Sequence, residues 1–69
     1  MPRYYVNETE QTNSRDHEVH KEGCYWLSLI NYKKDLGLHL SCDTAVIKAK
    51  ETYPTADGCK TCSNECHNS

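Results

Sequence analysis

The chain has 69 residues, with ten acidic and eight basic side chains, five cysteines and no phenylalanine. A chain of this length buries only about 60% of its unfolded surface, so we expect a metal or a disulfide to support a marginal core. Its longest mostly apolar run, residues 25–30, is too short to cross a membrane. A net charge of −2 gives no basic face for nucleic acid. We expect one domain, 1–69, without membrane or nucleic-acid partners.

The start of the chain and its cysteine count indicate the cellular compartment and the state of the thiols. The first residues lack the basic start and apolar core of a secretory signal, because the chain is polar after Val6. We therefore expect a cytoplasmic protein. Thiols stay reduced there, so an odd number of cysteines indicates metal ligands or reactive groups rather than disulfides. A disulfide-stapled extracellular module is the alternative.

Two short segments rich in β-branched and aromatic residues, RYYVN at 3–7 and HEVH at 17–20, predict a pair of antiparallel strands. The polar run between them predicts a long exposed turn. Because successive side chains of a strand face opposite sides, we expect one of Tyr4 and Tyr5 in the core. Core packing explains this pair better than stacking on bases.

LGLHL at 36–40 alternates as a third strand should, with its three leucines on one face and His39, which we expect to be exposed, on the other. The preceding YWLSLI at 25–30 has no clean period, and we assign it as irregular chain that covers the core. TADG at 55–58 predicts a turn, after which Ser63 could cap one short helical turn.

The clearest element is a helix within SCDTAVIKAKETYP, where Ser41 suits the N-cap, Asp43 lies in the first turn and Pro54 ends the helix. Its inner face is formed by Cys42, Ala45, Val46, Ala49 and Tyr53. The expected fold class is α+β, a small antiparallel sheet of about three short strands packed against one helix and held by zinc.

Two spacings predict the zinc site. Cys59 and Cys62 are separated by two residues, a gap at which a turn can aim both thiolates at one ion. His20 and Cys24 can present an imidazole and a third thiolate from a strand end and its turn, which Gly23 allows. Together these four residues satisfy the tetrahedral preference of zinc. The metal would join the start of the domain to its end.

VHKEGC, LGLHLSCDTAVIKAK and DGCKTC resemble two groups. One is a set of small uncharacterised bacterial proteins of the same layout. The other consists of Cys-rich metal-binding modules such as the zinc module of adaptive-response DNA repair methyltransferases. The second resemblance implies zinc ligation by His20, Cys24, Cys59 and Cys62. Since the repair module uses four cysteines and has a basic DNA-binding flank, which this chain lacks, the repair activity does not carry over.

Other residues are open as ligands. His17 should point away from His20, because it lies three positions before it along a strand, and a solvated role is expected. Cys66 and His67 lie outside the motif but could replace a proposed ligand. If the motif cysteines hold zinc, Cys42 and Cys66 remain, and we expect both as free thiols, the first buried and the second reactive.

These inferences predict a non-catalytic binding or adaptor module with an unknown protein partner and zinc as cofactor. Four protein ligands leave no open position for a catalytic water, so we do not expect an enzyme. The rival class is a thiol-based enzyme, either a zinc-thiolate alkyl acceptor or a CxxC redox protein. The sequence does not determine the physiological role or the oligomeric state.

Overall fold

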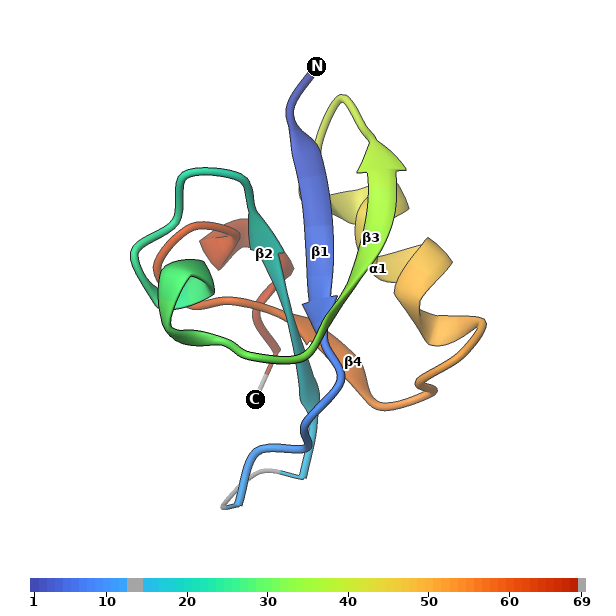
Figure 1. The fold of residues 1–69 in the computed structure, drawn as a ribbon. Coiled ribbons are helices and arrows are strands. Elements are labelled where there is room, and N and C mark those ends of the chain that lie inside the picture. Colours follow the sequence, from blue (N-terminus) through green and yellow to red (C-terminus); the bar gives the residue numbers. More distant parts are fainter. Residues whose placement is uncertain (13–14, 69) are drawn as a thin grey trace.

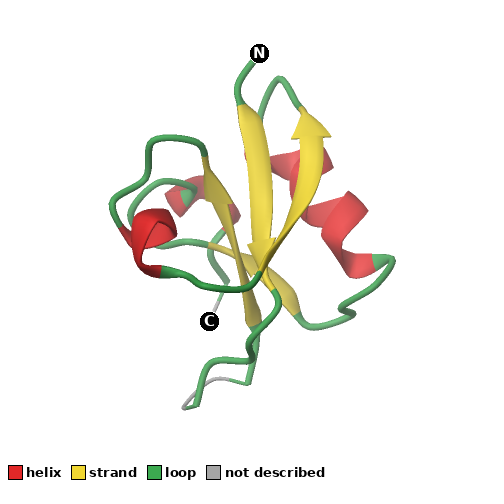
Figure 2. Ribbon diagram, in the orientation of Figure 1, coloured by secondary structure: helices red, strands yellow, loops and turns green. Residues whose placement is uncertain are grey.

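The computed structural model describes residues 1–12 and 15–68. In chain order its elements are the strands β1 (Arg3–Asn7) and β2 (His17–Lys21), the 3-10 helix η1 (Trp26–Leu29), β3 (Lys33–Leu38), the α-helix α1 (Cys42–Lys50), β4 (Ala56–Gly58) and the 3-10 helix η2 (Asn64–Cys66) (Figure 2). The predicted α+β class is confirmed. No helix in this described part is long and apolar enough to span a membrane.

The strands form one mixed sheet in the order β3-β1-β2-β4 (Figure 1). β1 pairs antiparallel with β2, as predicted for residues 3–7 and 17–20, and it also pairs antiparallel with β3. β4 lies parallel to β2. The sheet thus has one strand more than the about three expected, and only this added strand departs from the expected antiparallel pairing. β4 lies within TADG, for which the sequence predicts a turn. The strand was missed because three residues are too few to show a period and because the strand depends on pairing with a distant partner.

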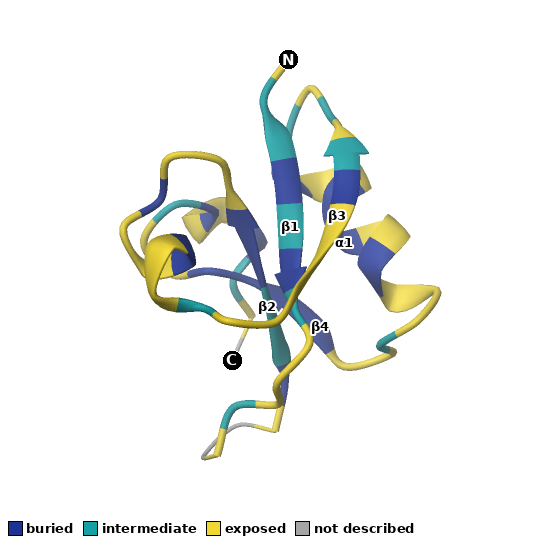
Figure 3. Cartoon of the chain, in the orientation of Figure 1, coloured by how far each residue is buried: buried dark blue, intermediate teal, exposed yellow. Residues whose placement is uncertain are grey.

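One face of the sheet packs on α1. The helix lies inside the predicted segment with Ser41 at its N-cap, although the Ser41 side chain makes no capping hydrogen bond. Its buried side faces the sheet, and its other side is exposed (Figure 3). This core contains Tyr4, Val6, Val19, Leu36, Cys42, Ala45, Val46, Ala49, Ala56 and Cys66, with Tyr53 packed against it. The predicted inner face of the helix is confirmed.

The third strand differs from its prediction. Leu36 is buried, but Leu38 and Leu40 are 51% and 83% exposed. The pairing register with β1 shifts between Tyr4 and Tyr5, and Gly37 opposite Tyr4 has a φ of +86°. This irregularity interrupts the alternation after Leu36. The strand also begins three residues earlier than predicted, at Lys33.

The last turn folds back onto the start of α1. η2 follows Ser63, as predicted, and Cys66 forms a disulfide with Cys42, their Cα atoms lying 6.2 Å apart. The expectation that both are free thiols is wrong. The reason is a close approach at Gly58, where an added Cβ would lie 2.6 Å from the Ser63 carbonyl oxygen and 2.7 Å from the Cys66 Cβ. The turn can reach α1 only because Gly58 has no side chain.

Replacing Cys66 by Ser should lower the free energy of unfolding by about 3 kcal/mol, since the disulfide closes a loop of moderate length. Urea unfolding of the oxidised protein and the variant measures the difference. The native protein should have a mass two units below its fully reduced value. A fully reduced mass for the folded protein would contradict the pairing.

Replacing Gly58 by Ala should destabilise the fold by about 3 kcal/mol or more, because the new methyl group would overlap backbone that cannot move independently. Gly37→Ala is the matched control. It meets no atom within 4 Å and strains only the backbone, so about 1 kcal/mol is expected. Thermal unfolding of both variants provides the comparison, and equal losses would be evidence against close packing at Gly58.

Candidate metal centre

The face of the sheet turned away from α1 carries the candidate site. Alternation along β2 places Val19 in the core with α1 and His20 on the opposite face, beside Tyr5 of β1. Figure 1 shows α1 and η1 on opposite sides of β1 and β2. A second, smaller cluster forms there from Cys24, Leu27 and Cys59, with Tyr5, Ile30 and Cys62 packed against it.

The structure brings together the four residues that the two spacings predict. One donor atom from each of His20, Cys24, Cys59 and Cys62 lies within 4.8 Å of all the others. The Nδ1 atom of His20 is 3.8 Å from the Cys24 sulfur and 3.9 Å from the Cys62 sulfur. Ligands around a tetrahedral zinc ion are about 3.6–3.8 Å apart, given its bond lengths. The cluster can therefore hold a metal ion after small side-chain movements.

Backbone hydrogen bonds align the two halves of the cluster. Gly23, at a φ of +85°, turns the chain after β2, and the Cys24 N–H donates to the Lys21 carbonyl. The Cys59 N–H donates to the Val19 carbonyl, at 2.9 Å. The Lys21 N–H donates to the Cys62 sulfur at 3.2 Å. β2 thus contacts both cysteines of the CKTC turn directly.

Burial determines the protonation of the imidazole. His20 is 1% exposed, and loss of solvation lowers its pKa to about 4. The ring is therefore neutral near pH 7, which is the form that ligates metals.

The two thiols closest to His20 differ in their surroundings. Burial raises the pKa of Cys62 to about 12. Burial also acts to raise the pKa of Cys24, but hydrogen bonds from Cys62 and from the backbone N–H groups of Trp26 and Leu27 lower it overall. Three thiolates cannot share this small space without a compensating cation, which a divalent metal would supply.

Glu18 is a site residue that the sequence analysis missed. Its Oε1 atom lies 3.6 Å from His20 Nε2, the ring nitrogen opposite the one that faces the sulfurs. Metal-bound histidines commonly direct their second nitrogen at a carboxylate, which fixes the ring orientation. The available signal was the spacing: Glu18 and His20 are two residues apart on a strand and share a face.

The alternative ligands lie elsewhere. His17 faces the other side of β2, stacks on Tyr53 with ring centroids 4.2 Å apart and donates to the Asn7 carbonyl, so it is half-buried rather than solvated. His67 Nδ1 lies 3.0 Å from the Gly58 carbonyl oxygen. Cys66 is occupied by its disulfide. His39 is likewise half-buried, between Thr44 and the Leu36 carbonyl.

No family model, curated protein or solved structure matches this chain. Function has to be inferred from the geometry of the cluster itself.

Replacing His20 by Ala should weaken binding of a divalent metal at least a hundredfold, because it removes one of four donors. His17→Ala is the matched control, since it removes the same ring from the opposite face of the same strand. Competition with a colorimetric chelator gives both affinities. Equal losses would show that the metal is held in a different place.

Proposed function

We propose that the chain is a small zinc-stabilised domain that acts as a non-catalytic binding module for another protein. The observation that supports zinc is the donor set: one buried imidazole nitrogen and three sulfurs within 4.8 Å of one another. Soft thiolates with imidazole in tetrahedral geometry suit zinc. Magnesium and calcium prefer oxygen ligands. Four protein donors would also leave no position for a reactive water.

The packing around the cluster supports a structural role for the metal. Among the apolar side chains described on this face, only Leu27, Cys24 and Cys59 are buried in the cluster, and the neighbours of Leu27 on η1 are exposed. Such a small apolar contact gains only a few kcal/mol. Zinc sites contribute about 10–16 kcal/mol in small finger peptides. A bound zinc ion would therefore be the main force that holds η1 and the CKTC turn on β2.

A zinc-thiolate alkyl acceptor is the second candidate, and one observation favours it: Cys62 is partly exposed whereas Cys24 and Cys59 are buried. The hydrogen bond from the Lys21 N–H withdraws electron density from the Cys62 sulfur, which opposes alkylation. Treatment of the zinc-loaded protein with a methylating agent, followed by mass spectrometry, separates the candidates. A stoichiometric methyl adduct on Cys62 would favour the enzyme.

Removal of zinc should unfold the whole domain, α1 included. β2 contributes Val19 to the core under α1 and His20 to the metal cluster on the other face. Loss of order in the cluster should therefore also disrupt the core under α1. Circular dichroism before and after chelation, with zinc added back, measures this. Magnesium added back is the control and should not restore the signal. Helicity that survives complete removal of the metal would contradict a structural zinc.

A further inference from the structure

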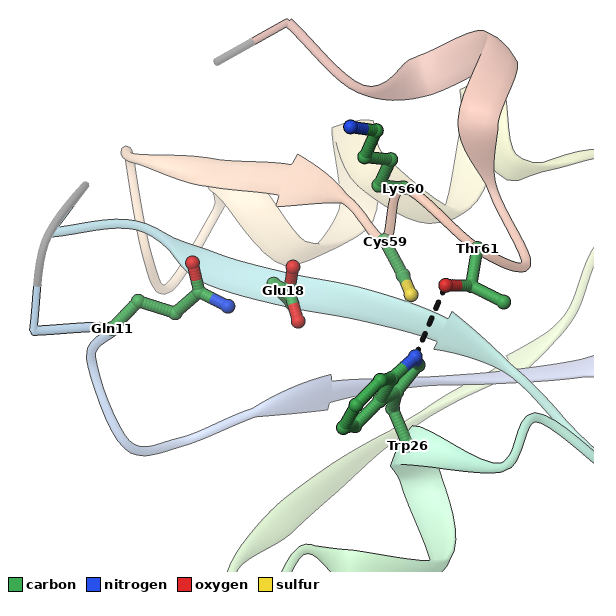
Figure 4. A pocket seen from close by; sticks show the side chains of 6 residues that line it. All are labelled: Gln11, Glu18, Trp26, Cys59, Lys60 and Thr61. Atoms are coloured by element: carbon green, nitrogen blue, oxygen red, sulfur yellow. Dashed lines mark hydrogen bonds between the residues drawn. The ribbon is translucent and has the colours of Figure 1, made fainter.

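A cavity of about 320 Å³ adjoins the metal centre (Figure 4). Its lining residues come from the turn before β2, from β2, from η1 and from the CKTC turn. They are Gln11, Glu18, Trp26, Cys59, Lys60 and Thr61. Since Cys59 belongs to the metal cluster, the cavity and the candidate zinc site share a wall.

The aromatic wall is fixed in place. The Trp26 indole N–H donates to the Thr61 hydroxyl at 3.0 Å, which joins η1 to the CKTC turn. Trp26 nevertheless remains 49% exposed. A ligand can therefore contact the indole without first ordering it, so little conformational entropy is lost on binding.

The cavity has acidic character. The side chain of Glu18 is 19% exposed and faces His20 through Oε1, and the Gln11 amide also hydrogen-bonds this carboxylate. A carboxylate has about four acceptor positions, so capacity is left for a ligand. Lys60 also lines the cavity, and its amine is directed away from the indole in Figure 4. Three thiolates around a zinc ion would add a further negative charge at Cys59.

We propose that this cavity binds a guanidinium group, carried on an arginine side chain of a partner protein. The group is planar, stacks on tryptophan and donates two parallel hydrogen bonds to a carboxylate. An ammonium group could pair with Glu18 but would stack poorly, and a neutral ring would not use the remaining acceptor positions of the carboxylate. This inference rests on the proposed function and names the chemistry of its partner.

The surroundings of the cavity favour a protein as the source of the arginine. Tyr25, which directly precedes η1 and packs edge-on against Trp26 with ring centroids 5.2 Å apart, is 66% exposed, and Leu29, at the other end of η1, is 58% exposed. Exposed aromatic and aliphatic side chains around an arginine-binding pocket are typical of protein interfaces. Residues that flank the arginine of a partner would cover them, whereas a free amino acid would not.

Trp26 is the chain's single tryptophan, so its fluorescence reports occupancy of the cavity. The zinc-loaded protein is titrated with N-acetyl-arginine amide and with N-acetyl-citrulline amide, which has the same shape without the charge. We expect a saturable change in tryptophan fluorescence, with a dissociation constant at least tenfold lower for the arginine amide than for the citrulline amide. Equal responses would overturn the proposal. A short peptide with arginine between apolar residues should bind more tightly than the amide, and equal affinity would overturn the protein source.

Glu18→Gln should abolish the preference for arginine over citrulline. Glu51→Gln, which makes the same change on the exposed surface of the chain, should leave it intact. Zinc is quantified in every sample, since Glu18 also contacts His20. Unmodified protein that binds no zinc refutes the proposed function, whereas unmodified protein with one zinc per chain but no discrimination refutes only the arginine site.

Discussion

The parallel pairing of β4 with β2 is the contact on which the rest of the structure depends. Gly58 pairs with Val19, so the next residue, Cys59, lies beside His20, and its N–H donates to the Val19 carbonyl. This register brings the CKTC turn to the two ligands that follow β2. It also places Gly58 beneath the C-terminal turn, where the missing Cβ lets Cys66 reach Cys42. One three-residue strand therefore positions both candidate cross-links.

The disulfide and the candidate metal cluster lie on opposite faces of the sheet, and a bound metal would compensate for a small core as the disulfide does. A chain of this size cannot bury enough apolar surface on two faces. The α1 face has the larger core, with a disulfide inside it. The other face has one buried leucine and the four convergent donors. The five cysteines therefore divide into a disulfide pair and a trio, and the trio would leave no unused thiol if it holds a metal.

Local patterns predict much of this structure. Capping and spacing locate α1, and alternation in HEVH correctly separates His17 from His20. The same alternation fails at Leu38, because Gly37 introduces an irregularity that depends on the register with β1. β4 and the disulfide were missed because both depend on contacts between residues distant in sequence. Spacing alone identifies the two donor pairs, His20 with Cys24 and Cys59 with Cys62, because the members of each pair are close in sequence. Only the approach of one pair to the other depends on the fold.

Glu18 connects the candidate metal centre to the cavity beside it. One of its oxygens faces the His20 imidazole, and the same carboxylate borders the cavity that Trp26 lines. A cation that draws Glu18 into the cavity would weaken its contact with His20, and a metal that holds His20 firmly would restrain Glu18. By thermodynamic linkage each effect has the same magnitude as the other. In the proposed arrangement the group that would orient a metal ligand would also recognise the partner, so stability and binding could not be adjusted independently.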